Sequence, residues 1–380
     1  MRGRRADGRP ALAGLVRWIA PGIALAGIAL AGGLSCTRPP ATYSAADFAT
    51  VRKIDAHLHD NAPGPAFADV ARDCGFSILS INVDYPDFPP LPDQQAFAKS
   101  HHDARPADEA WAATFFMAGW GEPGWAGKTI AHLDSALQDG AVAVKFWKNI
   151  GMVFRDAEGK LVMIDDPGLD TVFSYLIKRG VPIICHCGEP RDCWLPVPDM
   201  MSNDMKDYFS HHPQYHMYEH PEMPSYEAQV AARNHRLERS PGMKFMGAHL
   251  GSLEWNVDTL AAFLDRFPGA SVDLAARIDY LQIQSQRDRE KVRAFFAKYA
   301  DRLIYATDLV LNPADDTTAF KSATIAKWRS DWAYLATDTV MTQPVVTGTF
   351  QGLGLEKPVI DKLYRENAEK LFRGAWKKAG

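Results

Sequence analysis

The sequence predicts an α/β protein built as a (β/α)8, TIM-like barrel. Short apolar runs of β type alternate with amphipathic segments, which is typical of a parallel sheet covered by helices. A polar residue able to bind metal or transfer a proton follows several of these runs, at the point where the C-terminal mouth of such a barrel would lie. A chain of 380 residues, 47% apolar and 23% charged, can bury the core that this fold needs.

Eight strand–helix units follow one another from residue 51 onward. We expect strands at 51–58, 77–83, 113–117, 141–146, 181–185, 244–248, 270–274 and 303–306, and helices at 130–138, 170–178, 226–237, 257–267 and 289–299. About sixty residues separate the fifth and sixth strands, and connections this long are commonly functional. We therefore expect a long lid insertion after strand 5 of a barrel that spans residues 51–375. The insertion contains histidines that we expect in packing or surface roles: His211, His212, His216 and His220.

The first fifty residues are predicted to be targeting sequence rather than barrel. An arginine-rich stretch precedes an apolar, Gly/Ala-rich run over 18–34, and Cys36 follows small residues. We expect a signal segment over 1–35, similar to a bacterial lipoprotein signal in which Cys36 is acylated, and a tether over 36–50. The protein would then be exported and lipid-anchored in the periplasm or at the outer membrane. A soluble exported form and an uncleaved membrane anchor stay open.

The charge distribution limits the partners. The formal net charge is -4, and basic residues do not cluster outside the N-terminus, which argues against nucleic acid and against a polybasic membrane surface. We expect a small-molecule substrate, and membrane contact only through the N-terminal lipid anchor. The sequence does not give the oligomeric state.

Two cysteines flank a candidate ligand on the fifth strand. Cys185 and Cys187 surround His186, so alternation turns both thiols to the opposite face, where they would pack between barrel and helices. A disulfide is compatible with an oxidising compartment, but the sequence does not assign one.

The residues at the ends of the first, fifth and eighth strands suggest a metal site. His57 and His59 lie two apart on a strand, so both imidazoles point inward and suit one divalent ion. His186 ends the fifth strand and Asp308 the eighth, which neighbours the first in a closed barrel. Three imidazoles and a carboxylate would leave a position open for water, as a catalytic site requires.

The order of these motifs, with the C-terminal run NAEKLF over 367–372, resembles the amidohydrolase superfamily and within it the amidohydrolase-2 branch. That branch includes metal-dependent hydrolases and aromatic-acid decarboxylases, and the resemblance covers residues 51–372. The resemblance implies a TIM-like barrel with a divalent metal, expected to be Zn²⁺, held by His57, His59, His186 and Asp308. It also implies that Asp308 takes a proton from water, and that His249 faces the substrate or acts as acid or base.

Lys145, at the end of the fourth strand, leaves three alternatives open. Carboxylated, it would bridge two metals, as in binuclear members of the superfamily. Unmodified, it would lie near the substrate or a carboxylate and one metal would suffice. It could also point outward in a structural role. A charge inside the mouth is costly unless it is paired, so an inward Lys145 should have a partner.

Further residues near the mouth are candidates for contact with the substrate. Asp273 and Arg277 follow the seventh strand, and Arg277 could bind a substrate carboxylate through paired hydrogen bonds. Tryptophans in these loops could form the wall of an apolar pocket. The substrate-contact candidates are Glu189, Arg191, Trp147, Trp194 and Arg277.

From these residues we expect a metal-dependent hydrolase that attacks a small ester, lactone or amide with metal-activated water, with Asp308 and His249 as catalytic residues. A metal-dependent, non-oxidative decarboxylase of an aromatic or unsaturated acid is the first alternative. A non-catalytic surface binding protein with a vestigial metal site is the second.

Overall fold

The computed structural model describes residues 41–376. The expected signal segment, Cys36 and the start of the expected tether lie outside the described residues. Residues 41–50 of that tether pack on the barrel: the Tyr43 hydroxyl donates a hydrogen bond to Asp361 Oδ1 at 2.8 Å, and Phe48 is buried. Between residues 41 and 376, no helix is both long enough and apolar enough to cross a membrane.

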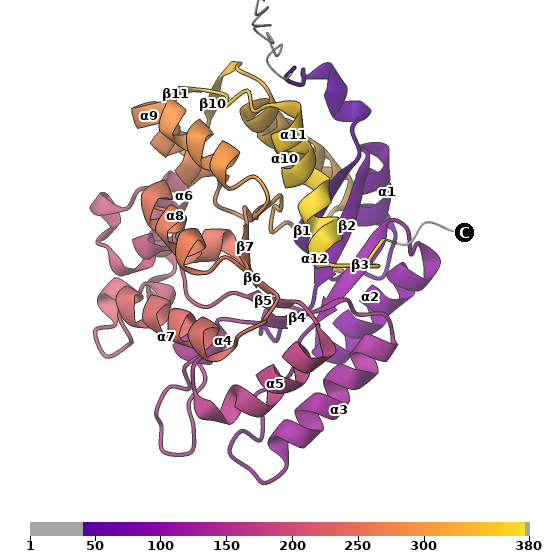
Figure 1. The fold of residues 1–380 in the computed structure, drawn as a ribbon, viewed down its shortest axis with the longest axis vertical. Coiled ribbons are helices and arrows are strands. Elements are labelled where there is room, and N and C mark those ends of the chain that lie inside the picture. The colour runs from indigo at the N-terminus through magenta and orange to yellow at the C-terminus, as the bar shows by residue number, and fades with distance from the viewer. Residues whose placement is uncertain (1–40, 377–380) are drawn as a thin grey trace, which may run out of the picture. The chain divides into compact units, whose positions relative to one another are not determined.

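One parallel sheet forms the centre of the molecule (Figure 1). Within the described residues its order is β8-β7-β6-β5-β4-β3-β2-β1-β9. The strands are β1 (Lys53–Asp60), β2 (Phe76–Ile81), β3 (Glu109–Ala113), β4 (Ala143–Phe146), β5 (Ile183–Cys185), β6 (Phe245–Gly247), β7 (Ala270–Asp273), β8 (Leu303–Ile304) and β9 (Val310–Leu311). The α/β, TIM-like fold expected from the sequence is confirmed.

Residues 303–311 join the two edges of this sheet. β8 pairs with β7, and β9 pairs with β1. Between them, the Ala56 and His59 amides donate to the Tyr305 and Leu309 carbonyls at 3.1 and 2.8 Å. The eighth strand is thus broken in the middle, and Asp308 lies in the break.

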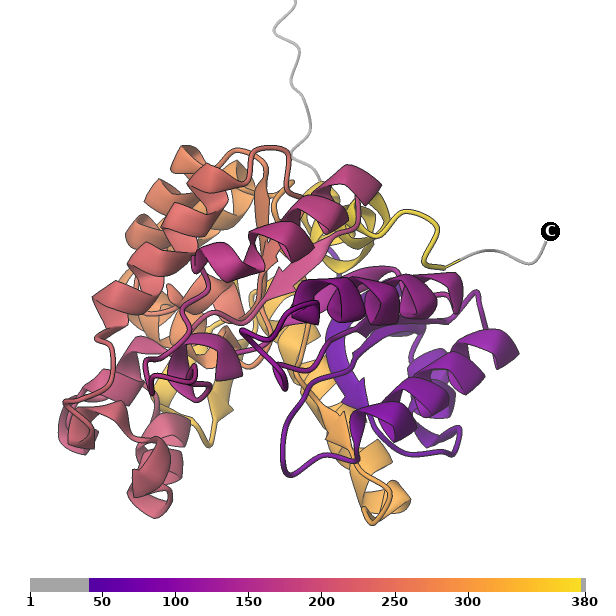
Figure 2. The same ribbon diagram turned by 90° about the horizontal axis from the view of Figure 1, so that it is seen from below.

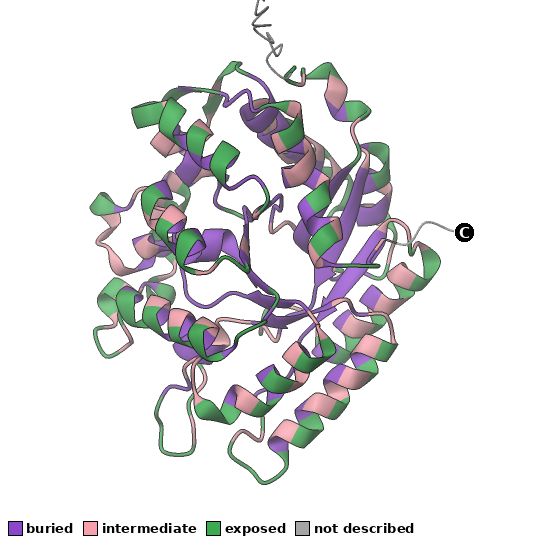
Figure 3. Cartoon of the chain, in the orientation of Figure 1, coloured by how far each residue is buried: buried purple, intermediate pink, exposed green. Residues whose placement is uncertain are grey.

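Helices surround the strands in both views (Figures 1 and 2). Their inner faces are buried and their outer faces exposed, as amphipathic segments require (Figure 3). They are α1 (Ala66–Asp73), α2 (Leu91–Ala104), α3 (Trp125–Gln138), α4 (Asn149–Met152), α5 (Asp170–Arg179), α6 (Asn203–His211), α7 (Tyr226–Arg239), α8 (Val257–Arg266), α9 (Ile278–Lys298), α10 (Thr317–Ala336), α11 (Lys357–Asp361) and α12 (Asn367–Leu371). A hairpin of β10 (Val340–Gln343) and β11 (Val346–Gln351) packs on α9.

A bulge in β1 turns the histidine pair into the barrel. Ala56 belongs to the inner apolar cluster, whereas Leu58 belongs to the outer cluster beneath the helices. Strict alternation would put both on one face, but the pairing with β2 shifts between Asp55 and Leu58. The extra residue lets His57 follow Ala56 on the inner side, with His59 beside it.

The predicted bounds of the third strand were wrong. The strand covers Glu109–Ala113 rather than 113–117. The strand begins at Glu109, whose side chain is only 5% exposed although charged side chains are rarely buried. Its carboxylate lies in a buried polar cluster with Asp60 and His101.

The long connection after β5 runs from residue 186 to 225 and contains α6 and several short 3-10 turns. Its histidines bond to nearby backbone carbonyls: His216 Nε2 lies 2.7 Å from the Leu195 carbonyl, and His212 Nδ1 lies 2.8 Å from that of Tyr208. These contacts agree with packing roles. Movement of this segment as a lid stays a prediction.

Cys185 and Cys187 lie in the outer apolar cluster, on the helix side of the sheet as expected. The structure joins them by a disulfide, a pairing that the sequence left open.

Removing the buried Asp55 carboxylate should weaken the closure of the barrel. It accepts hydrogen bonds from the Thr307 amide (3.1 Å), the Thr307 hydroxyl (2.6 Å) and the Trp328 indole (2.9 Å). Asp55→Ala leaves these donors buried without an acceptor, which should cost about 3 kcal/mol of unfolding free energy in urea denaturation. Asp103→Ala, which removes an exposed pair with Lys99, should change it by less than about 0.5 kcal/mol. A loss below about 1 kcal/mol for Asp55→Ala would contradict this role.

Candidate metal centre

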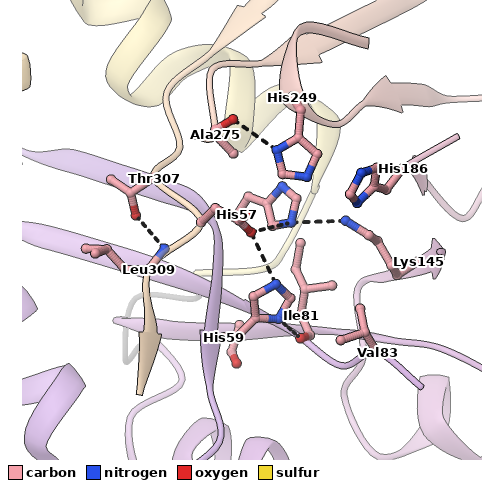
Figure 4. A network of polar contacts seen from close by, with 12 residues as sticks. His57, His59, Ile81, Val83, Lys145, His186, His249, Ala275, Thr307 and Leu309 are labelled. Carbon is pink, nitrogen blue, oxygen red and sulfur yellow. Dashed lines mark hydrogen bonds and ion pairs between the residues drawn. The ribbon is translucent and has the colours of Figure 1, made fainter. Parts of the chain in front are cut away.

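Three of the four predicted ligands converge at the mouth of the barrel. Asp308 Oδ1 lies 3.4 Å from His57 Nε2 and 3.3 Å from His59 Nε2. Ligands bound tetrahedrally at 2.0–2.1 Å lie roughly 3.4 Å apart, so this spacing suits a divalent ion. Figure 4 shows the two histidines directed to one space, beside the segment that carries Thr307 and Leu309.

Hydrogen bonds to the far nitrogens direct both lone pairs toward Asp308. His57 Nδ1 donates to Asp273 Oδ2 at 2.9 Å, and His59 Nδ1 donates to the Ile81 carbonyl at 2.6 Å. In each neutral ring Nε2 is then an acceptor. Two imidazole lone pairs and a carboxylate oxygen facing one another repel unless a cation lies between them. The donor set therefore fits a metal.

The fourth predicted ligand, His186, stands beside this group rather than within it. Its Nε2 is not among the atoms within 4.8 Å of one another that His57, His59 and Asp308 supply. The His186 ring lies 4.2 Å from that of His249, and its buried Nε2 has no hydrogen-bond partner in residues 41–376. Burial lowers the pKa of His186 to about 3, so the ring is neutral and its lone pair is free.

Asp273 organises the site from beneath. One carboxylate oxygen, Oδ2, orients His57. The other, Oδ1, accepts hydrogen bonds from the His249 amide at 2.7 Å and the Ala275 amide at 3.1 Å. Its side chain is completely buried. Asp273 was only a weak candidate in the sequence because no local motif surrounds it. Asp55 was missed for the same reason.

Backbone strain is concentrated at this centre. Asp308 and His249 have φ of 66° and 58°, in the left-handed region that side chains other than glycine rarely adopt. Each such residue costs about 1–3 kcal/mol and persists only where its surroundings hold it. The Asp308 amide donates to the His57 carbonyl at 2.8 Å, which fixes the carboxylate beside the histidine pair.

The charge balance keeps Asp308 ionised. Burial pushes the pKa of Asp308 up, but the cationic groups of the site, Lys145 among them, hold it well below its ordinary value. The side chain remains 29% exposed, so water reaches it. His249 is a further buried imidazole of the site, with its Nδ1 3.0 Å from the Ala275 carbonyl. Burial lowers the pKa of His249 well below its ordinary value.

Lys145 points into the site, and the outward alternative was wrong. Its Nζ lies 3.0 Å from His57 Nε2, and the residue is 1% exposed. Burial lowers the pKa of Lys145 to about 8, against the attraction of Asp308 and Asp273. A neutral amine is the form that reacts with carbon dioxide, so a carbamate and a free amine both remain compatible with this position.

A pocket of about 1090 Å³ opens beside the metal centre. Aromatic rings lead to it from His59: Phe88 lies 5.1 Å from the His59 ring, Tyr85 lies 5.2 Å from Phe88, and Trp147 lies 5.2 Å from Tyr85. Tyr85 and Phe88, in the loop after β2, were not expected from the sequence. Trp147 lines the pocket, as the sequence argument expected for the wall of a binding site.

Glu189 also lines the pocket and forms an ion pair with Lys148. Its second oxygen lies 3.7 Å from His186 Nε2. Burial opposes ionisation of Glu189, but the charge of Lys148 holds its pKa well below the ordinary value.

Two predicted substrate contacts lie elsewhere. The Trp194 indole donates to the Pro224 carbonyl at 3.0 Å and its ring packs against Tyr226, inside the long connection. The Arg191 guanidinium lies 4.5 Å above the Trp255 ring. Neither residue lines the large pocket. Both serve the packing of this connection, which adjacency in sequence to His186 could not reveal.

Arg277 is buried at the mouth with unused capacity to bind an anion. It is 6% exposed, and its Nη1 donates to the Ala276 carbonyl at 2.6 Å. Within residues 41–376 its Nε has no hydrogen-bond partner and its guanidinium makes no ion pair within 4.0 Å. It is not among the residues that line the large pocket.

Comparisons with known proteins agree with these features. Residues 54–374 match the model of a family described as "Amidohydrolase" (Amidohydro_2). No curated protein matches the sequence. Similar solved structures include an uncharacterised TIM-barrel protein from Bordetella bronchiseptica, with 13% identity, a TM-score of 0.48, and coverage of 86% of this chain and 100% of that chain.

Two further solved structures are similar at the same level. One is 2,6-dihydroxybenzoate decarboxylase from Rhizobium, with 13% identity, a TM-score of 0.48, and coverage of 85% and 98% of the two chains. The other is described as a "probable 2-pyrone-4,6-dicarboxylic acid hydrolase" from Acinetobacter baumannii, with 11% identity, a TM-score of 0.46, and coverage of 85% and 99%. Likenesses this distant do not indicate the reaction.

Asp273→Asn should weaken metal binding without unfolding the protein. The amide keeps the shape of the side chain but loses the charge that orients His57, and loss of such a partner typically costs 10- to 100-fold in metal affinity. Competition with a chromophoric chelator measures this. Asp265→Asn, at an exposed acid that pairs with Lys298, is the matched control and should bind metal like the unchanged protein. Equal affinities for both variants would contradict the role of Asp273.

Proposed function

This chain belongs to the amidohydrolase family, and from that premise and its site we propose that it is a metal-dependent hydrolase of small carbonyl compounds. The bond broken would be that of an ester, lactone or amide, with water as the nucleophile. Asp308 carries the proposal, because this carboxylate lies beside both histidines of the pair and still meets solvent.

The metal would be held by His57, His59 and Asp308, with His186 as a further ligand. When bound, a divalent ion such as Zn²⁺ acts as a Lewis acid and lowers the pKa of a coordinated water to about 7. Asp308 Oδ2 then takes the proton of the attacking water, while Oδ1 keeps its place between the histidines. A carboxylate held in ionised form is suited to accept a proton rather than to supply one.

His249 and Lys145 act on the other side of the site. The His249 ring lies 5.0 Å from that of His57, so both rings can face the same bound substrate. Its Nδ1 hydrogen is committed to the Ala275 carbonyl, so Nε2 is the atom available to the substrate. Lys145, if it remains an amine, donates hydrogen bonds to the carbonyl oxygen on which charge develops.

The surroundings of the metal centre support a proposal for the class of substrate. Phe88, Tyr85 and Trp147 offer an apolar, aromatic wall, and Arg277 offers a buried cation without a carboxylate partner among the described residues. A guanidinium in this state binds a carboxylate strongly. We propose a substrate with a flat or apolar body and at least one carboxylate besides the scissile carbonyl.

Decarboxylation is a second candidate, and the same two features favour it. Arg277 would bind the departing carboxylate, and the aromatic wall would hold an aryl ring. This reaction requires a proton donor for the ring carbon, which would have to be Asp308 or His249.

A panel of lactones, esters, amides and aryl carboxylates separates the two reactions. We expect metal-dependent formation of a new carboxylic acid without carbon dioxide release, and loss of turnover after chelation. Asp308→Asn should lower kcat by about 100-fold or more, since it removes the base. Asp315→Asn, in the nearby turn that caps residue 312, should not change kcat. Release of carbon dioxide would contradict hydrolysis and would indicate decarboxylation instead.

Arg277→Met should raise KM for a carboxylate-bearing substrate by roughly 10- to 100-fold, the equivalent of a charged hydrogen bond. KM for an analogue without the carboxylate should stay within about twofold. Arg287→Met, at an exposed arginine on α9, is the control and should leave both substrates unaffected. Equal effects of Arg277→Met on both substrates would show a structural role instead.

A further inference from the structure

A second group of ligand-type side chains lies behind the wall of the mouth. Asp60 ends β1, Glu109 begins β3, and His101 lies on α2. Asp60 shares the outer face of the sheet with Leu58, and Glu109 shares it with Trp111. The group is therefore on the opposite side of β1 from His59, between the sheet and α2.

The spacing of these side chains matches that of the mouth. His101 Nδ1 lies 3.4 Å from Asp60 Oδ2 and 3.8 Å from Glu109 Oε2, and one donor atom of each residue lies within 4.8 Å of the others. A point roughly 2 to 2.4 Å from all three atoms exists at such spacings, which is close to the bond lengths of a first-row divalent ion.

The group is also left without other partners. Asp60 is 1% exposed, and neither of its carboxylate oxygens has a hydrogen-bond partner in the described part of the chain. Glu109 is 5% exposed, and burial raises its pKa to about 7. Burying two carboxyl groups side by side is costly unless a cation or a proton lies between them.

The nearby Arg105 does not neutralise these carboxylates through an ion pair. Arg105 donates from Nη2 to Asp69 Oδ1 at 3.0 Å, and among residues 41–376 it makes no ion pair with Asp60 or Glu109. Burial lowers the pKa of His101, which keeps the imidazole neutral and its lone pair available. Asp60, His101 and Glu109 thus present acceptor atoms to one common space.

We propose that Asp60, His101 and Glu109 form a second divalent-cation site, separate from the one at the mouth. Two carboxylates and an imidazole suit Zn²⁺ or Mn²⁺. A cation there ties β1, β3 and α2 together and fixes the end of the strand that carries His57 and His59. This site does not rest on the proposed function, since it needs no turnover to be detected.

Zn²⁺ content after loading and dialysis tests the site by difference. Glu109→Gln should bind one Zn²⁺ per chain fewer than the unchanged protein and keep the zinc at the mouth. Glu158→Gln, at an exposed glutamate, should bind the full amount. Lys145→Met tests a carbamate bridge separately, so that a second metal at the mouth is not mistaken for this site.

Crystals of the Zn²⁺-loaded protein give the location. Anomalous scattering at the zinc edge should show a peak between Asp60, His101 and Glu109 in addition to the one at the mouth. His101→Gln serves as a second variant should Glu109→Gln fail to fold, and it should also lose one Zn²⁺. Full zinc content in a folded variant, or no anomalous peak at these three residues, would overturn the proposal.

Discussion

The hydrogen bonds between β1 and residues 305–311 hold the whole metal centre in place. The amides of Ala56 and His59 donate to one side of this segment, and the Asp308 amide donates back to the His57 carbonyl. The same ladder that closes the barrel therefore forces Asp308 into its left-handed conformation and aims its carboxylate at the histidine pair. The hydrogen bonds that close the barrel are therefore also the ones that position Asp308 beside the histidines.

Buried charge is the second constraint on this centre. Asp273 and Asp308 lie with Lys145 and four buried imidazoles at the mouth of the barrel. Such a cluster is stable only if each charge has a partner, and acceptor atoms that face one another need a cation. Asp60 and Glu109 repeat this situation on the other face of β1. A strand with acceptor groups on both faces would be stabilised by cations on both sides.

The sequence predicted what local pattern encodes. The spacing of His57 and His59 on a β-type run placed both imidazoles in the mouth, and the last strand placed Asp308 beside them. Strand 3 was displaced because Glu109 is a charge inside a sheet, and only the fold brings it to Asp60 and His101.

The features that the sequence did not reveal depend on contacts distant in sequence. Asp55 and Asp273 follow no motif, and their importance comes from partners that other strands supply. Arg191 and Trp194 follow His186 closely in sequence, but the long connection turns them away from the pocket. His186 itself faces His249 rather than joining the other ligands directly.

The origin of the oxygen in the product tests the central claim most directly. Turnover of a substrate from the hydrolysis panel in ¹⁸O-labelled water, followed by mass spectrometry, shows whether water attacks the carbonyl. The account predicts one ¹⁸O atom in each newly formed carboxylate in a single turnover, and at least about 100-fold slower formation of this labelled product when Asp308 is replaced by Asn. A product without ¹⁸O, with deuterium from heavy water on carbon instead, would contradict it.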